Sequence, residues 1–219
     1  MLRTILFDLD GTLMETAPDI ADAINDTLQR LGHPSADEDL VRGWIGDGAR
    51  ALLDKALLHA GAPAASSAAA WPGFADDYAR RCGGRSWVHA GVRPMLRRLR
   101  QQGLQLVLLT NKEAVFAQRL LHLHGLDGSF ELVVAGDSLP VKKPDPGVVH
   151  HALHHLGCTA DQALLVGDST TDVRTARAAG INVWLVRHGY PQGSLSGADA
   201  PDGFIEHFDQ FMPAVANPA

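Results

Sequence analysis

Cysteine is scarce in this chain of 219 residues, which contains only Cys82 and Cys158. The two lie in unrelated contexts, without a CxxC pair or a Cys/His spacing, so the sequence gives no sign of a disulfide framework or a zinc finger. This usage fits a reducing compartment. The stretch after Met1 also lacks the charged, apolar and small-residue succession of a signal peptide, and we expect a cytoplasmic protein.

Long apolar runs and basic clusters are also missing. The longest apolar runs have only the length of a strand, so we expect no segment that spans a membrane. Nineteen Lys and Arg face 25 Asp and Glu, giving a formal net charge of −6, and no basic cluster is interleaved with aromatic residues. We therefore do not expect a nucleic acid as the partner. The hydrophobic content of 46% suffices for one large domain, or for a core with a small accessory domain.

What the chain does have is a series of short apolar runs, each followed by a helical pattern. Their nearly continuous apolarity is typical of strands that are buried on both faces. The runs cover residues 4–7, 104–109, 132–134, 163–166 and 183–186, and the later helical patterns cover 111–123, 146–156 and 170–179. This alternation predicts an α/β fold with a parallel sheet.

The pattern changes between the first run and about residue 86. No buried-strand run occurs there, whereas amphipathic helical patterns cover 20–31, 49–60 and 68–81. A further helix, predicted over 92–101, then leads to the second strand. We therefore expect a discontinuous catalytic core, residues 1–15 and 87–219, with a helical insert at 16–86.

Polar residues follow the predicted strands at the points where these end. Asp8 follows the first strand, Thr110 the second, and Asp168 the fourth. Because the carboxyl ends of parallel strands share one edge of a sheet, we expect these side chains to converge. Gathered carboxylates repel one another unless a cation intervenes, and Mg²⁺ is a hard cation that takes oxygen ligands together with substrate phosphates. Asn111 at a helix start and Lys143 add groups that bind anions.

Four motifs in order carry a specific resemblance. They are Asp8-Leu9-Asp10-Gly11-Thr12, then Thr110, then Lys143-Pro144, then the run Gly167-Asp168-Ser169-Thr170-Thr171-Asp172. In this order and strand context the chain resembles the haloacid dehalogenase superfamily. The resemblance implies a Rossmann-like parallel core with an inserted α-helical cap, and a Mg²⁺-dependent phosphatase acting on a small phosphomonoester.

The resemblance also implies roles for the motif residues. Asp8 is the nucleophile that forms an aspartyl-phosphate, and Asp10 is the general acid and base. The metal is held by the Asp8 side chain, the Asp10 backbone carbonyl and Asp168. Thr110, Asn111 and Lys143 bind the phosphate. For Asp172 a direct metal role and an ordinary place in the first turn of a helix both stay open.

A glycine-rich loop in the insert, Gly43-Trp44-Ile45-Gly46-Asp47-Gly48-Ala49, bears on the substrate. With Thr110-Asn111-Lys112 and Lys143-Pro144-Asp145-Pro146 it resembles the phosphoglycolate phosphatases of that superfamily. Arg42, Gly46, Asp47 and Arg50 are candidates for substrate binding, the arginines for a substrate carboxylate. The acid at Asp47 would repel such a carboxylate, which leaves a sugar phosphate open, including an N-acetylmuramic acid 6-phosphate type.

Other interpretations of the same residues stay open. A phosphomutase of the same superfamily would keep every motif, a receiver domain shares acids with a Thr and a Lys, and a degenerate binding module would keep the fold alone. Lys143 adjoins Lys142, so the assignment of the phosphate-binding lysine depends on the proline that follows. The histidines of the run at 150–155, HHALHH, are expected on a solvated helix face. The sequence leaves the oligomeric state open.

Overall fold

The structure, a computed structural model, describes residues 1–63, 66–190 and 195–213. Its centre is a six-stranded parallel sheet in the order β5-β4-β1-β6-β7-β8. The strands are β1 (Thr4–Phe7), β4 (Gln105–Leu109), β5 (Leu132–Val134), β6 (Ala163–Gly167), β7 (Asn182–Val186) and β8 (Gly203–Ile205). Strand β1 lies between β4 and β6 with Thr4 opposite both Gln105 and Ala163, so the ends of these three strands are level.

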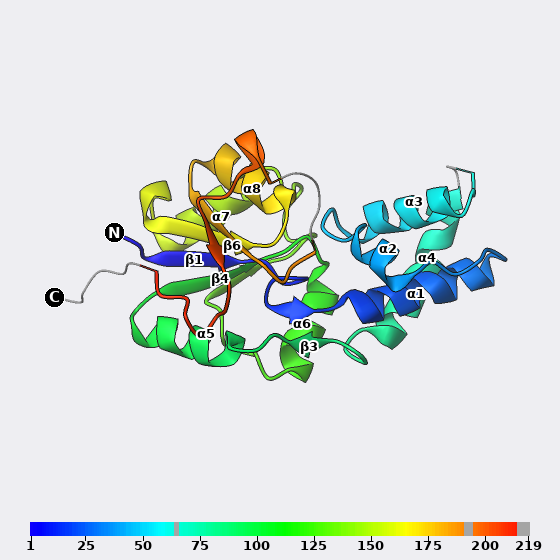
Figure 1. Cartoon of the computed structure of the whole chain (residues 1–219), viewed down its shortest axis with the longest axis horizontal. Coiled ribbons are helices and arrows are strands. Elements are labelled where there is room, and N and C mark those ends of the chain that lie inside the picture. Colours follow the sequence, from blue (N-terminus) through cyan, green and yellow to red (C-terminus); the bar gives the residue numbers. More distant parts are fainter. Residues whose placement is uncertain (64–65, 191–194, 214–219) are drawn as a thin grey trace.

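Helices cover both faces of this sheet (Figure 1). Helices α5 (Val92–Gln101) and α6 (Ala114–Leu123) pack on one face, and α7 (Gly147–Leu156) and α8 (Thr170–Ala179) on the other. Two short 3₁₀ turns, Ala160–Gln162 and Gly197–Asp199, complete the connections. Side chains of β1 alternate between the two apolar layers: Ile5 and Phe7 face α5 and α6, whereas Leu6 faces α7 and α8.

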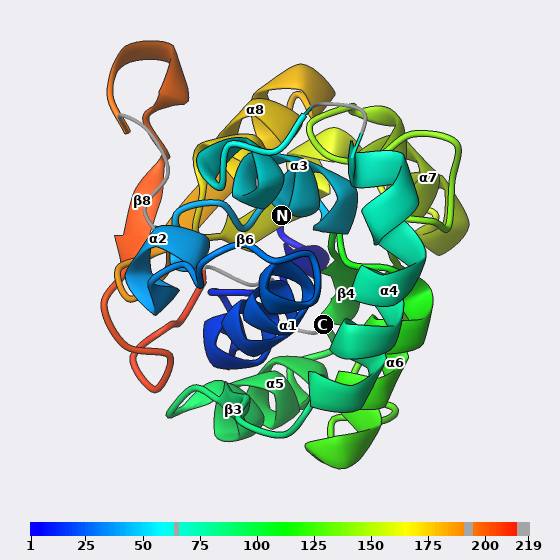
Figure 2. The same cartoon turned by 90° about the vertical axis from the view of Figure 1, so that its right-hand side faces the viewer.

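A group of four helices lies beyond the carboxyl ends of the strands (Figures 1 and 2). These are α1 (Ala17–Arg30), α2 (Glu38–Arg42), α3 (Ala49–His59) and α4 (Ser66–Arg81). The chain leaves the core through β2 (Met14–Glu15) and returns through β3 (Trp87–Val88), which pairs antiparallel with β2. The helices therefore hang from a two-strand connection and face the edge of the sheet where we expect the polar residues.

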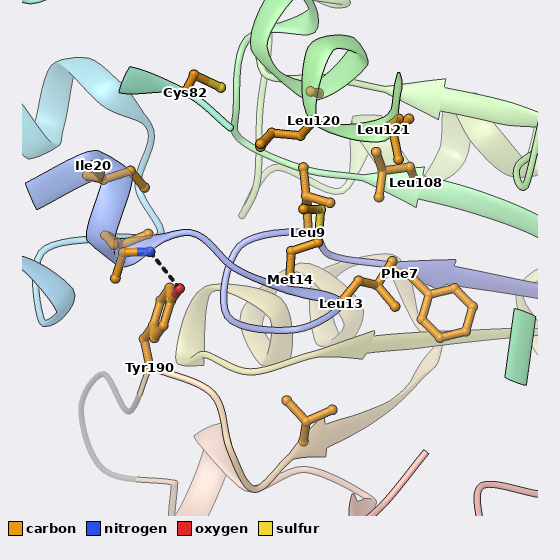
Figure 3. Close-up of a cluster of buried hydrophobic side chains, with 14 of the residues drawn as sticks. Phe7, Leu9, Leu13, Met14, Ile20, Cys82, Leu108, Leu120, Leu121 and Tyr190 are labelled. Carbon is orange, nitrogen blue, oxygen red and sulfur yellow. Dashed lines mark hydrogen bonds between the residues drawn. The ribbon is translucent and has the colours of Figure 1, made fainter. Parts of the chain in front are cut away.

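The apolar core continues from the sheet into this connection (Figure 3). Phe7, Leu9 and Leu13 are completely buried and pack in the same layer as Leu108. Tyr190, which follows β7, closes this layer, and its hydroxyl accepts hydrogen bonds from the backbone N–H groups of the residues that begin α1, at 2.9 and 3.0 Å. The start of α1 is thus fixed to the loop after β7.

The fold class predicted from the sequence is confirmed. The five expected strands agree with the structure to within one residue at each end, and the expected helices at 92–101 and 170–179 are correct. The helix expected from residue 111 begins only at Ala114, because residues 110–113 turn into the sheet edge instead. Helix α2 and strands β2, β3 and β8 were not predicted, since each is five residues or shorter. In the described part of the chain, no helix has the length and apolarity needed to cross a membrane.

Candidate active site

Three strands deliver polar residues to one place. Asp8 follows β1, Thr110 follows β4 and Asp168 follows β6. The N–H of Asp8 still donates to the Val166 carbonyl at 2.9 Å, and that of Thr110 to the Val134 carbonyl at 3.0 Å. Their backbones therefore continue the ladder of the sheet, and the convergence expected from the sequence is present.

Three buried carboxylates form a cluster at this edge. One oxygen each of Asp8, Asp168 and Asp172 lies within 4.8 Å of the others, and the residues are 7%, 6% and 0% exposed. Burial, reinforced by Asp172, raises the pKa of Asp8 to about 6, and burial with repulsion from Asp172 and Asp8 raises the pKa of Asp168. Such mutual repulsion is relieved by a cation, and a set of carboxylate oxygens fits a hard divalent ion.

Lys143 joins this cluster to its base. Its Nζ lies 2.8 Å from Asp8 Oδ1 and 2.7 Å from Asp172 Oδ1. Burial alone would lower the pKa of Lys143, but the two carboxylates outweigh it and raise that pKa. The structure thus brings Lys143 to the site, whereas the adjacent Lys142 reaches the backbone oxygen of Asp47.

Asp172 is held by more partners than its place in a helix first turn requires. Besides Lys143, it accepts from the Ser169 hydroxyl at 2.7 Å and from the N–H groups of Ser169 and Asp168 at 3.1 and 3.2 Å. Burial would raise the pKa of Asp172, yet Lys143 and Ser169 lower it. Asp172 therefore stays ionised, caps α8 and fixes Lys143 against Asp8, while one of its oxygens remains within the cluster.

The side chain of Asp10 points to different partners. Its Oδ1 accepts from the Thr16 hydroxyl at 2.6 Å and its Oδ2 from Lys112 Nζ at 2.9 Å. Thr16 stands at the start of α1, so this carboxylate is tied to the helical group as well as to the core. The carboxylate of Asp10 consequently lies outside the acidic cluster, and of this residue the backbone carbonyl is the group that the sequence resemblance assigns to a metal.

Thr110 and Asn111 are buried at the start of the turn before α6. The Thr110 hydroxyl oxygen accepts from the N–H of Lys112 at 3.2 Å, which leaves its own O–H free to donate to an anion. Asn111 Nδ2 donates to the carbonyls of Gly46 and Lys143 at 2.9 and 3.0 Å. The Asn111 side chain thus connects the glycine-rich loop to the segment that carries Lys143.

A pocket opens between the helical group and the sheet edge. It holds about 480 Å³ between atoms, the open space at its mouth included. Its floor is polar and its upper wall largely apolar; the lining comprises Asp8, Asp10, Thr110, Asn111, Lys112 and Glu113 from the core, and Ile20, Ile45, Gly46, Gly48, Ala49, Leu52, Phe74 and Tyr78 from the helical group. Lys112, Glu113 and Tyr78 were not proposed as site residues from the sequence. The signal for the first two was the unbroken polar run that follows a buried strand.

The two candidate arginines do not line this pocket. Arg42 pairs with Glu15 and lies over the ring of Tyr190, 5.2 Å from its centroid. Arg50 lies 4.1 Å above the ring of Trp71. The structure therefore assigns both to packing and to the connection between the helical group and the core, and gives neither a path to a substrate carboxylate.

Asp47 also turns away from the pocket. It forms an ion pair with Lys55 at 2.8 Å and accepts from the Thr171 hydroxyl at 3.3 Å. Burial would raise its pKa, but these partners lower it. The repulsion that the sequence suggested between Asp47 and a substrate carboxylate is thus offset by Lys55. The expected solvated face at 150–155 is confirmed, since all four histidines there are exposed.

A model of the haloacid dehalogenase-like hydrolases matches residues 5–186 of this chain. With the parallel sheet and the acidic edge described above, this defines the class: the chain belongs to the haloacid dehalogenase-like hydrolase family.

Curated relatives narrow the class further. The phosphoglycolate phosphatase of Pseudomonas putida is 38% identical, over 99% of this chain and 81% of its own length. The plasmid-encoded phosphoglycolate phosphatase of Cupriavidus necator is 42% identical, over 98% of this chain and 93% of its own. A crystal structure described as a predicted phosphoglycolate phosphatase from Haemophilus somnus superimposes with a TM-score of 0.88 at 32% identity and covers 95% of both chains. The chain is a phosphoric monoester hydrolase of this family.

Proposed function

We propose that this enzyme hydrolyses 2-phosphoglycolate, with Mg²⁺ bound at the acidic cluster and an aspartyl-phosphate intermediate on Asp8. The observation that carries the proposal is the buried set of Asp8, Asp168 and Lys143 at the floor of a small pocket. The curated relatives support the choice of substrate, because they carry this activity in their names. The same likeness supports two units, a core of residues 1–15 and 87–219 and a cap of 16–86.

In the first step Asp8 attacks the phosphorus atom of the ester. A bond forms between a carboxylate oxygen of Asp8 and phosphorus, and the bond from phosphorus to the glycolate oxygen breaks. Mg²⁺, held by Asp8, Asp168 and the Asp10 carbonyl, would neutralise phosphate charge. Lys143 and the Thr110 hydroxyl supply positive charge and a donor to the phosphoryl oxygens, with the backbone at Asn111 beside them.

Proton transfer falls to Asp10. Its carboxyl group gives a proton to the departing glycolate oxygen, and as a carboxylate it then takes one from the water that attacks the phosphoenzyme. The second attack breaks the bond between Asp8 and phosphorus and releases inorganic phosphate. Asp10 is suited to this exchange because Thr16 and Lys112 hold both of its oxygens at the pocket, away from the cluster.

A substrate panel tests the proposal. The enzyme is assayed for phosphate release with 2-phosphoglycolate, sugar phosphates including N-acetylmuramic acid 6-phosphate, nucleotides and pyrophosphate, with Mg²⁺ and with EDTA. We expect the largest kcat/KM for 2-phosphoglycolate and no turnover in EDTA. An equal or larger kcat/KM for another ester would reject the proposed substrate. Formation of an isomerised sugar phosphate without free phosphate would instead identify a mutase.

The nucleophile is tested by Asp8→Asn, which keeps the shape of the side chain. We expect loss of turnover with the far-UV spectrum of the wild type. Asp10→Asn should still form a phosphoenzyme from an ester with a good leaving group, but hydrolyse it slowly. Retention of most activity by Asp8→Asn would refute the mechanism.

A further inference from the structure

Lys112 is a buried cation with unused hydrogen-bonding capacity. Its side chain is only 4% exposed, and within the described residues its Nζ has one hydrogen-bond acceptor, Asp10 Oδ2 at 2.9 Å. An ammonium group has three N–H donors, and leaving donors unsatisfied in a buried place costs free energy. Because Lys112 lines the pocket, the remaining donors are available to a molecule bound there.

A second unused group comes from the helical side of the same pocket. Tyr78 in α4 is 3% exposed, and its hydroxyl has no hydrogen-bond partner among the residues that the structure describes. The Nζ of Lys112 lies 5.0 Å from the centroid of the Tyr78 ring. Two donors, one charged and one neutral, therefore meet from opposite walls of the pocket, and neither is satisfied by the protein.

We propose that Lys112 and Tyr78 together bind a carboxylate group of the substrate. This inference rests on the proposed function and specifies the part of the substrate that leaves. Asp10 is the link: one of its oxygens is on Lys112, and the carboxyl group protonates the leaving oxygen. In 2-phosphoglycolate the carboxylate carbon is two covalent bonds from that leaving oxygen. A substrate held at Asp8 and Asp10 thus directs its carboxylate toward Lys112, and the Tyr78 hydroxyl donates to it.

The remaining wall of the pocket fits a short acid better than a sugar. Ile20, Leu52 and Phe74 are buried apolar residues that offer no partner for hydroxyl groups. Glu113 is the one other acid lining the pocket besides Asp8 and Asp10. Burial raises the pKa of Glu113, and no ion pair joins it to Lys112 in the described residues, so the lysine is not occupied by it. The class of substrate is a short phosphorylated carboxylic acid.

The test compares two esters that differ only in the proposed group. Ethyl phosphate has the same chain length as 2-phosphoglycolate and ends in a methyl group instead of the carboxylate. Phosphate release is measured with both esters for the wild type, Tyr78→Phe and Lys112→Met, and the readout is the ratio of the two kcat/KM values. In Tyr78→Phe we expect kcat/KM for 2-phosphoglycolate to fall by about tenfold or more, mainly through KM, with ethyl phosphate unchanged within about twofold.

Lys112→Met lowers the rate with both esters because Lys112 touches Asp10, but the ratio should fall further than in Tyr78→Phe. Tyr190→Phe is the matched control, since the chain has only these two tyrosines and the hydroxyl of Tyr190 lies on Glu15 and the start of α1 instead. We expect it to leave the ratio unchanged.

The outcomes separate the two proposals. A wild-type preference for 2-phosphoglycolate that survives both Tyr78→Phe and Lys112→Met overturns the carboxylate site and leaves the proposed function intact. A preference for a different phosphorylated carboxylic acid, lost in Tyr78→Phe, keeps the site and rejects the proposed substrate. Equal kcat/KM for the two esters in the wild type overturns both.

Discussion

Replacement of Asp172 by Asn probes how the cluster is held together. The native carboxylate accepts from Lys143 with one oxygen and from three groups at residues 168 and 169 with the other. An amide of the same shape has one oxygen and one NH₂ group. In either orientation of the amide, a donor then faces a donor in a place that is completely buried.

The magnitude follows from the burial of both partners. Removing one member of a buried ion pair costs about 3–5 kcal/mol, and the lower figure applies here because Lys143 keeps Asp8 as a partner. For a protein of this size about 3 kcal/mol corresponds to a fall in Tm of about 6–12 °C. Lys143 should also be less firmly placed on Asp8, so kcat should fall as well.

The pH dependence adds a second check on Asp172. Because the folded protein holds the pKa of Asp172 below its ordinary value of 3.8, the stabilisation is complete above that pH and is lost as the pH falls below it. The difference in Tm between wild type and Asp172→Asn should therefore stay constant from pH 8 to 5 and shrink only below about pH 4.

Thermal unfolding of three proteins decides the matter. The control is Asp199→Asn, which breaks the exposed pair with Arg174 at 2.8 Å and should change Tm little. If Asp172→Asn lowers Tm no more than Asp199→Asn does, the buried network does not hold the site in the way argued above.

Further expectations concern the metal site and the connection to the helical group. Gly11→Ala places a Cβ 2.4 Å from Asp168 Oδ2 and should raise the Mg²⁺ concentration needed for half-maximal activity, whereas Gly32→Ala, at nearly the same positive φ with no atom within 4 Å, should not. Mg²⁺ should raise the Tm of the wild type and leave that of Asp168→Asn unchanged; an equal rise would place the ion elsewhere. Burial, together with His188, lowers the pKa of His89 from 6.5 to about 4, with Arg42 acting in the same sense and Glu15 against it. Neutral His89 thus contributes stability above pH 6.5 that is lost as the pH falls toward 4, and His89→Gln should flatten the decline in Tm between these values.

The sequence could predict the sheet edge because two simple regularities combine there. Continuous apolar runs identify buried parallel strands, and such strands bring their carboxyl ends to one edge. Asp8, Thr110 and Asp168 were therefore placed correctly from their positions alone. The convergence of Lys143 came from the motif order, since a lysine in a loop carries no periodicity of its own.

The upper wall of the pocket could not be predicted in the same way. Tyr78 lies on a helix whose pattern indicates only which face is buried, and burial against the core looks the same as burial against a pocket. Arg42 and Arg50 flank the loop in sequence, yet Glu15 and the Trp71 ring compete for them, and these partners depend on tertiary packing. The direction of Lys112 likewise depends on the tight turn after Thr110, which delays α6 by three residues relative to the expected start.

The direct pairing of Glu15 with Trp87 places the departure and the return of the chain next to each other. A short turn between them would delete residues 16–86 and leave every strand of the six-stranded sheet with its neighbours. The shortened chain would keep the groups that carry out phosphoryl transfer and lose Thr16, Tyr78 and the glycine-rich loop. Reactivity and selectivity are thus encoded in separable stretches of the polypeptide, and bulky esters should become accessible once the second stretch is gone.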